Sequence, residues 1–553
     1  MENKTKQWWD ALGKPQYGGE LVIRANRNLQ NFDPYFDESN LCSIQGAWME
    51  RLVCDDWTVG PETWNFGMGW HPEKYKKGHL AESWEFTDPH THVVHLKKGI
   101  RWQNIPPANG REFTADDVVF HIKRLYGPDG DFTKPSPFHP HANAYPDLIS
   151  VTAADKYTVV FKFKTANKDA IMWTLYNFSL ATCMENREAV QKWGDVADWH
   201  HAIGTGAFIL KDFVSGKSAE LVKNQDYWGY DERYPQNKLP YIEKVKYLII
   251  PDEDAALELM RAGKIDVMYV GSAVKAQALQ KTNPGVQLIP AGVAPPPSIQ
   301  MKIDKGIFSD IRVRKAMQLA LDLPAIAKSY YQGLVAPYPA MVTSRIMKGW
   351  VFPYEEWPQD LKDEYAYNPT AAKKLLAEAG YPDGIKVNLA ANSSADLKML
   401  QIIKSYFSNI GIDLQIQVIE PDAWNDFTEK GQKADQLIYH AYGPFGHSFD
   451  AQRQIGRFRS MDTVTDALAV KANTEPDEAE MKQLLRDANE RAARQHFAIS
   501  TLEPQGYALC QPWFKGFSGQ IHSVWMNGGG PCMASFYLGR FWIDQKLKKS
   551  LGY

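Results

Sequence analysis

Hydrophobic and polar residues repeat with two different periods, which alternate along the chain. Runs rich in valine, isoleucine and aromatic residues, such as residues 20–25 (ELVIRA) and 158–164 (TVVFKFK), predict strands. Residues 114–127 and 252–263 carry apolar side chains three and four positions apart, which predicts helices. Alternation of the two patterns is typical of layered α/β proteins, so we expect an α/β fold.

Two of the predicted helices have recognisable ends. Thr114 is a candidate N-cap, and Asp117 stands three residues later, as in a capping box. In residues 368–384, Asn368 can cap the helix, Pro369 suits its first position and Gly380 suits its C-terminal end. These signals predict helix boundaries as well as helix faces.

The second half of the chain continues the same pattern. Residues 397–411 predict a helix with one apolar stripe, and Gly411 ends it. The following residues, 412–420, alternate strictly, which predicts a strand with one buried face. The side chains expected on that face are Ile412, Leu414, Ile416 and Val418.

Length and charge narrow the possible classes of protein. A chain of 553 residues suggests roughly three to four structural units. The net charge of −3 and the absence of a Lys/Arg block argue against a nucleic-acid partner. No apolar run reaches the ~18 to 20 residues that span a bilayer. The chain is rich in aromatic residues, which we expect mostly in the core, with some at a binding surface.

The five cysteines include no C-x-x-C pair, which disfavours a zinc ribbon or a redox motif. Cys510 and Cys532 flank a glycine-rich turn. They can form a disulfide if the compartment is oxidising, or remain thiols. The sequence leaves both alternatives open.

Candidate catalytic and metal-binding groups are sparse. His90, His92 and His95 lie close together in a predicted strand, where a solvated strand edge is a better explanation than a zinc or nickel site. Residues 204–208 (GTGAF) lack the Lys-Ser/Thr of a phosphate-binding loop, which favours a tight turn. No nucleophile, base and orienting group can be assembled, so a secreted hydrolase with a metal or His/carboxylate site remains only an alternative.

Several segments together resemble one protein family. In order along the chain, from about Tyr17 to about Asp426, they include LAESWE, LKKGIRW, FTADDVVF, GTGAFILKDF, LVKNQDYWG, IRVRKAMQLALD and YNPTAAKKLLAEAGYPDG. This series resembles the family-five extracytoplasmic solute-binding proteins. These are the binding subunits of ABC importers for peptides, nickel and some oligosaccharides.

The resemblance implies a bilobal, class II periplasmic-binding-protein fold with an extra subdomain in lobe I. The crossings between lobes are then expected at 293–299, where three prolines stiffen the chain, and at 499–505. The expected parts are a tether (1–16), lobe I (17–50, 204–297 and 501–553), its inserted subdomain (51–203) and lobe II (298–500).

The resemblance also implies a non-catalytic, monomeric receptor that needs no cofactor. It captures a small solute between its lobes by hinge closure and delivers it to the permease subunits. Members of the family are exported, and many are anchored through a lipidated N-terminal cysteine. The polar start of the chain therefore resembles a tether that remains after a leader has been removed.

Residues 442–452 (YGPFGHSFDAQ) correspond to a wall of the family's ligand cleft. Peptide-binding members have Gly-Trp-x-x-Asp here, and the aspartate pairs with the ligand's α-ammonium group. The aligned position in this chain is Pro444, which puts recognition of a free peptide N-terminus in doubt. The ligand-binding residues predicted around it are Tyr442, Gly443, Phe445 and His447.

Trp424 matches a tryptophan that some peptide-binding members place in the cleft, although a core position is an alternative. The opposite wall is expected in residues 27–34, where Asn28, Gln30 and Asn31 offer amide groups. Oligosaccharide and peptide ligands remain open. The missing aspartate and the aromatic residues favour the first, and family frequency favours the second. The carboxylates that would restore the peptide reading are Asp422, Asp426 and Asp450.

Overall fold

The structure of the 553-residue chain is a computed structural model. It describes residues 7–29, 31–34, 42–64, 73–127, 148–164, 166, 171, 183–290, 297–340, 349–393, 395–420, 423–424, 427, 435–440, 462–475, 477–519 and 534–553.

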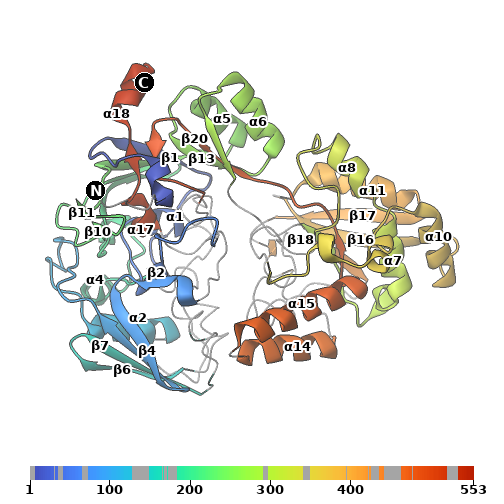
Figure 1. The fold of residues 1–553 in the computed structure, drawn as a ribbon, viewed down its shortest axis with the longest axis horizontal. Helices are drawn as coiled ribbons and strands as arrows, with labels where there is room; N and C mark the ends of the chain where they lie inside the picture. Colours follow the sequence, from blue (N-terminus) through green and yellow to red (C-terminus); the bar gives the residue numbers. More distant parts are fainter. Residues whose placement is uncertain are drawn as a thin grey trace, which may run out of the picture. The chain divides into compact units, whose positions relative to one another are not determined.

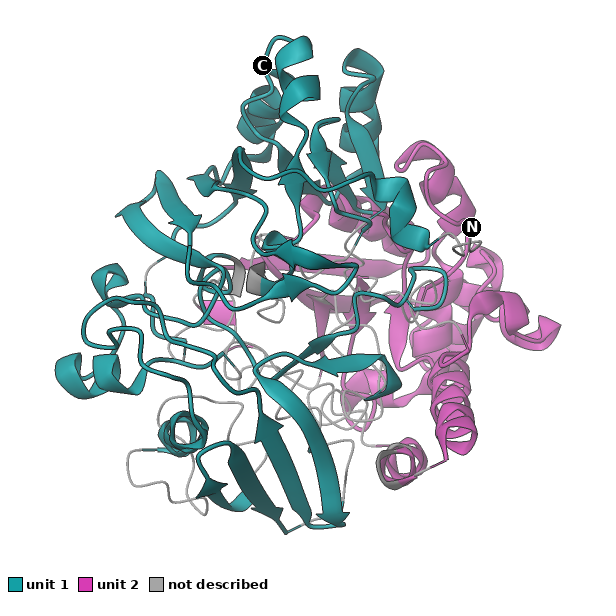
Figure 2. Ribbon diagram, turned by 60° about the vertical axis from the view of Figure 1, so that its left-hand side comes forward, with its two compact units in different colours: residues 1–292, 506–553 teal, residues 293–505 magenta. Residues whose placement is uncertain are grey.

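The chain divides into two compact units, coloured separately in Figure 2. Unit 1 combines Met1–Gly292 with Gly506–Tyr553, and unit 2 is Val293–Gln505. Each unit contains its own sheet and its own hydrophobic core, as the α/β pattern of the sequence predicts. From Gln7 onward the segment expected to be a tether packs on unit 1, where the Trp8 indole N–H donates to the carbonyl of Thr58 at 3.1 Å.

The main sheet of unit 1 has seven strands in the order β14-β20-β13-β1-β12-β9-β8. Their bounds are β1 (Glu20–Ala25), β8 (Phe208–Val214), β9 (Ser218–Lys223), β12 (Lys244–Ile249), β13 (Val267–Val270), β14 (Gln287–Pro290) and β20 (Tyr507–Cys510). Strand β1 is parallel to β12 and β13, whereas β20 returns from the last part of the chain and pairs antiparallel with β13 and β14. This return makes the C-terminal segment a structural part of unit 1.

A second core of unit 1 lies on a four-stranded antiparallel sheet. Its order is β4-β5-β7-β6, with β4 (Ala81–Asp88), β5 (Thr91–Leu96), β6 (Leu148–Asp155) and β7 (Thr158–Phe163). Helix α2 (Ala115–Tyr126) contributes Val118, Ile122 and Leu125 to this core. The predicted capping box of Thr114 and Asp117 is confirmed. This core, which draws residues from Leu52 to Ile203, is called the inserted core below.

The other elements of unit 1 are short or lie at the sides of these sheets (Figure 1). They are η1 (Trp8–Leu12), α1 (Cys42–Gln45), β2 (Val53–Asp55), η2 (Glu73–Tyr75), β3 (Lys76–Gly78), α4 (Arg187–Trp193), η6 (Trp199–His201), β10 (Tyr230–Asp231), β11 (Tyr234–Lys238), α5 (Glu253–Arg261), α6 (Ala273–Thr282), β21 (Phe514–Lys515), α17 (Ala534–Leu538), β22 (Trp542–Ile543) and α18 (Gln545–Ser550).

Unit 2 is built on a five-stranded sheet in the order β17-β16-β18-β15-β19. The strands are β15 (Ser298–Gln300), β16 (Ile385–Asn392), β17 (Ile412–Ile419), β18 (Gln436–His440) and β19 (Ala498–Ser500). Strand β16 is parallel to both β17 and β18. The helices are η7 (Gly306–Ser309), α7 (Ile311–Leu319), α8 (Leu323–Ser329), η8 (Tyr354–Glu356), α9 (Gln359–Asp363), α10 (Pro369–Glu378), α11 (Leu397–Ser408), α14 (Thr463–Thr474) and α15 (Glu478–Arg494).

The predicted helix end signals of unit 2 are confirmed. The Asn368 side chain accepts the N–H of Ala371 at 3.0 Å, and Pro369 opens α10. Gly411 ends the α11 turn with a φ of +87°, a value that favours glycine. Strand β17 departs from strict alternation, because Val418 is 45% exposed while Ile419 is buried. Up to Ile416 the apolar side chains of β17 face the main core of unit 2. Ile419 lies on the opposite face of the sheet, where it packs with Trp424.

One expectation about the histidines was wrong. The histidines of residues 90–95 do not mark a strand edge, because β5 lies between β4 and β7. His92 is fully buried in this sheet, between the rings of Phe86 and Phe161. Of the two alternatives left open for Cys510, the structure has the free thiol, which is buried in β20. Cys532 lies outside the described residues.

Candidate functional site

In unit 2 the carboxyl ends of parallel strands meet at one edge of the sheet. Asn392, the last residue of β16, is the register partner of Ile419, the last residue of β17. Ala391 of β16 is likewise opposite Tyr439 of β18. Ligands of open α/β sheets bind outside the carboxyl ends of the strands. This edge is therefore the candidate ligand-binding edge of unit 2.

Each of the two predicted ligand-binding segments of unit 2 follows a strand that ends at this edge. Trp424 comes after β17, and residues 442–447 come after β18. The structure describes Trp424, whereas Tyr442, Gly443, Phe445 and His447 lie outside the described residues, as does Gln30 of unit 1. The strand order thus explains why the segments after β17 and β18, which are separated in the sequence, both begin at the carboxyl edge of the sheet.

Trp424 lies in a small hydrophobic cluster on one face of the unit 2 sheet. Its side chain is 5% exposed and packs with Ala390, Ile419 and Ile438, and its ring is 5.9 Å from that of Phe427. The main core of the unit lies on the other face, where Leu437 and Tyr439 point. Trp424 is therefore held firmly at the carboxyl edge by packing.

A polar group that the sequence reasoning missed lies at the same edge. The Tyr330 hydroxyl donates to both carboxylate oxygens of Asp396, at 2.8 Å each. Asp396 also caps α11 by accepting the N–H of Met399 at 3.1 Å. Its position directly before the apolar stripe of 397–410 was the sequence signal that could have revealed it. Burial raises the pKa of Tyr439 well above its ordinary value, so its hydroxyl stays neutral.

Unit 1 repeats this geometry at the carboxyl end of β1. Ala25, the last residue of β1, is opposite Ile249 of the parallel strand β12. The buried Arg24 guanidinium donates to the carbonyls of Ile250 and Pro251, both at 2.9 Å, and fixes the two strand ends together. Residues 26–34, called the β1 loop below, leave the sheet at this point and contain the predicted binding residues of unit 1.

Two asparagines of the β1 loop make hydrogen bonds within unit 1. Asn28 donates through Nδ2 to Ser215 Oγ at 2.8 Å and accepts the N–H of Gly216 through Oδ1 at 2.7 Å. Asn31 accepts the N–H of Asp33 through Oδ1 at 2.7 Å. Asn28 therefore attaches the loop to the turn between β8 and β9, and Asn31 shapes the loop from within.

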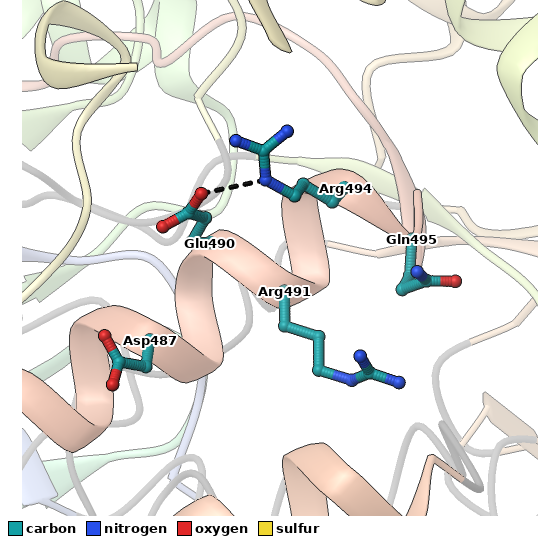
Figure 3. Close-up of a pocket in the computed structure, with 5 residues that line it drawn as sticks. All are labelled: Asp487, Glu490, Arg491, Arg494 and Gln495. Carbon is teal, nitrogen blue, oxygen red and sulfur yellow. Dashed lines mark hydrogen bonds and ion pairs between the residues drawn. The ribbon is translucent and has the colours of Figure 1, made fainter. Parts of the chain in front are cut away.

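A charged groove of about 220 Å³ runs along α15 of unit 2 (Figure 3). Arg494 lies against Glu490 in this view, with Nε 2.8 Å from Oε1, and its Nη1 is 3.0 Å from Asp360 Oδ2. Arg491 binds Asp462 through two hydrogen bonds of 2.7 and 2.8 Å. Because both arginines already have carboxylate partners, this groove is a weaker candidate than the strand ends.

Metal and membrane candidates are also absent from the part of the chain that the structure describes. There, no group of three or more His, Cys, Asp or Glu side chains is arranged to hold a metal ion. No helix within the described residues has both the length and the apolar character needed to cross a membrane.

Comparison with known proteins decides the family. Residues 77–458, more than half of the chain, match the family model described as "Bacterial extracellular solute-binding proteins, family 5 Middle". The chain belongs to the family 5 solute-binding proteins. Members of this family are non-enzymatic components of ABC importers, so the alternative of a hydrolase is excluded.

Curated relatives of this family 5 protein bind different ligands. Heme-binding protein A of Haemophilus influenzae is 26% identical over 482 residues, covering 80% of this chain and 83% of the relative. The glutathione-binding protein GsiB of Shigella flexneri is 25% identical over 418 residues, covering 75% of this chain and 72% of the relative. The relatives thus agree on the role of a binding protein and differ in the solute.

Solved structures with the same fold include two peptide complexes. DppA of Helicobacter pylori, in complex with the peptide STSA, superposes with a TM-score of 0.72 at 20% identity, covering 96% of this chain and 99% of DppA. AppA of Bacillus subtilis, in complex with a nonapeptide, gives 0.69 at 21% identity, covering 96% and 100%. The predicted class II periplasmic-binding-protein fold is therefore confirmed for this family 5 protein.

Proposed function

We propose that this family 5 protein captures a short peptide, or a ligand with peptide-like amide groups, outside the cytoplasm and delivers it to an ABC permease. The solutes in the names and titles of its relatives support this class, because they include glutathione and two peptides. The loops at the strand ends of both lobes contribute to the site. Closure of the lobes stabilises the bound state only through the ligand's higher affinity for the closed form.

The observation that carries the proposal is the alignment of strand ends in each unit. Amide-bearing residues of the β1 loop follow Ala25, and the segments with Trp424 and residues 442–447 follow the in-register ends of β17 and β18. Asn28, Gln30 and Asn31 supply the donors and acceptors that an amide backbone requires. Tyr442, Gly443, Phe445 and His447 are the residues proposed to bind the ligand from unit 2, together with Trp424, whose ring packs with Ala390, Ile419 and Ile438.

Recognition of the ligand's amino terminus is proposed to differ from that of the peptide-binding members with an aspartate at this position. Pro444 stands there, and proline has neither a charge nor an N–H. Residue 444 itself therefore cannot offset the desolvation of an α-ammonium group buried next to it, which is expensive. The ligand is therefore bound through its amide groups and side chains, with no ion pair at residue 444.

An oligosaccharide is the second candidate ligand. It is favoured by Tyr442 and Phe445 beside Pro444, because aromatic faces stack on sugar rings without requiring a charge. Replacing either ring by alanine should then reduce saccharide affinity strongly and leave the melting temperature unchanged.

The remaining parts of the proposal concern the cellular setting. The protein acts as a monomer without a cofactor. It is held at the cell surface or in the periplasm, so fractionation of the native host should recover it outside the cytoplasm.

Native mass spectrometry of the purified protein tests the proposed function. We expect a mass increment from one retained small molecule, which stays unchanged in mass over hours and is displaced by excess peptide. Conversion of the retained molecule over time would contradict a binding-only role.

A further inference from the structure

The C-terminal end of the β1 loop is attached to a buried ionic network. Asp33 is fully buried, and its carboxylate accepts hydrogen bonds from Arg124 Nη1 at 3.2 Å and Nη2 at 2.5 Å. Arg124 Nη1 is also 3.7 Å from Glu185 Oε1, and Glu185 Oε2 is 2.5 Å from His121 Nδ1. Burial alone would raise the pKa of Glu185, but His121 and Arg124 outweigh it, so the pKa is lowered and the carboxylate stays charged.

This network joins two different parts of unit 1. Arg124 belongs to α2, whose neighbouring residues Ile122 and Leu125 are part of the inserted core. Asp33 belongs to the β1 loop, which leaves the main sheet. Two backbone contacts strengthen the connection, because Phe32 N–H donates to Ala197 O at 3.0 Å and Val196 N–H donates to Asp33 Oδ2 at 3.3 Å.

The network also determines the position of a predicted binding residue. The Asp33 carboxylate accepts hydrogen bonds from Arg124, and the Asp33 backbone N–H donates to Asn31 Oδ1. A shift of the Asp33 backbone would break both contacts, and the ion pair with Arg124 opposes such a shift. Arg124 is therefore connected to Asn31 through one intermediate residue, and its planar guanidinium fixes the orientation of the carboxylate as a lysine would not.

We infer that Arg124 is a positioning residue for ligand binding, which holds Asn31 in place through Asp33. The inference rests on the proposed function, because it takes the β1 loop to be part of the ligand site. The inserted core then contributes to ligand affinity through Arg124, in addition to forming a subdomain of unit 1.

The test compares two charge-removing double variants of the full-length protein. Asp33→Asn/Arg124→Met removes both charges of the pair. Glu185 keeps its contact with His121, and the amide keeps an acceptor for Val196. Asp231→Asn/Arg233→Met is the matched control, because this pair is also buried and bidentate, at 3.0 Å twice, but lies in the β10–β11 segment. Glutathione, trialanine and N-acetyl-trialanine are the calorimetric probes.

We expect the first double variant to bind the best probe at least about tenfold more weakly, whereas the control keeps the wild-type affinity. Adding Asn31→Ala should weaken the wild type but add little to the first variant, since coupled residues are not additive. If the wild-type protein binds a probe and the first double variant binds it with the same affinity, the inference is overturned and the proposed function stays intact.

Hydrogen–deuterium exchange tests the positioning role of Arg124 without any ligand. Backbone amides of Asn31–Asp33 should exchange faster in the first double variant than in the control, without any probe present. If no probe binds the wild type, the proposed ligand class fails, and this exchange result alone decides the positioning role. Unchanged exchange would overturn it. Arg124→Lys, which keeps the charge but loses the bidentate geometry, provides the same comparison if the double variant does not fold.

Discussion

The side chain of Asn28 accepts the backbone N–H of Gly216 at 2.7 Å and so attaches the β1 loop to the turn between β8 and β9. Asn28→Ala removes this acceptor and the donor to Ser215 Oγ. We expect the free energy of unfolding to fall by about 1 kcal/mol in urea titrations, the usual net value of such bonds. Asn28→Asp keeps the acceptor, so it should be milder. Equal losses in both variants would contradict the role of the Gly216 contact.

The burial of Trp424 predicts a large effect on stability. Trp424→Ala would empty the cluster formed with Ala390, Ile419 and Ile438, and such changes cost about 3–5 kcal/mol. Trp350, also buried in unit 2, is the matched control. We expect Trp424→Ala and Trp350→Ala both to lower the melting temperature. Under conditions where both variants are folded, only Trp424→Ala should weaken ligand binding. Loss of binding without loss of stability would show that packing is not the main role of Trp424.

Gly204 is predicted to tolerate no side chain. A β-carbon at this position would overlap the backbone carbonyl of Trp48, which cannot move aside like a flexible side chain. The same region is held by Gln103 N–H donating to Gly204 O and Gly206 N–H donating to Trp48 O, both at 2.9 Å. Gly204→Ala should therefore lower the free energy of unfolding by more than about 2 kcal/mol. A neutral effect would contradict this close approach.

Acid should destabilise unit 2 through Glu364. Hydrogen bonds from His496, at 3.1 Å, and Lys315, at 2.7 Å, lower the pKa of Glu364 to about 2, against burial. Because the unfolded chain binds this proton near pH 4.5, the contribution is complete above pH 4.5 and is lost as the pH falls towards 2. Burial also lowers the pKa of His496, so its protonation on unfolding below pH 6.5 acts in the same direction.

Glu364→Gln measures this contribution. With the carboxyl group 30% exposed, solvent screening reduces it to about 1–2 kcal/mol at pH 7. The stability difference between wild type and variant should shrink to zero near pH 2 in denaturant titrations. Asp383→Asn, at an exposed position in the same unit, is the control. A difference independent of pH would show that Glu364 acts without titrating.

The sequence pattern predicted much of the fold because local signals and tertiary packing agree. The capping box of Thr114 and Asp117 and the start of α10 at Asn368 are local chemistry, which the residues themselves specify. The alternation in β17 failed at Val418, because which face is covered near a strand end depends on neighbours distant in the sequence. His92 was misjudged for the same reason, since strand order determines which strands are edges.

The candidate site was only partly predictable. Family resemblance and strand ends indicate the segments, but they do not reveal what each side chain contacts. The contacts of Asn28 with Ser215 and Gly216, and of Asp33 with Arg124, link residues far apart in sequence. No periodicity or motif encodes such pairs. Asp396 was the exception, because its cap position before α11 was visible in the sequence.

Isothermal titration calorimetry with matched peptides tests the central claim most directly. Short peptides with free and with acetylated amino termini, glutathione and oligosaccharides of two to five units are titrated into the purified protein. We expect a peptide or glutathione to bind at one site per chain and acetylation to leave the affinity of the peptides unchanged, because Pro444 cannot pair with an ammonium group. Tight binding of free peptides that is lost on acetylation, or binding of saccharides alone, would contradict it.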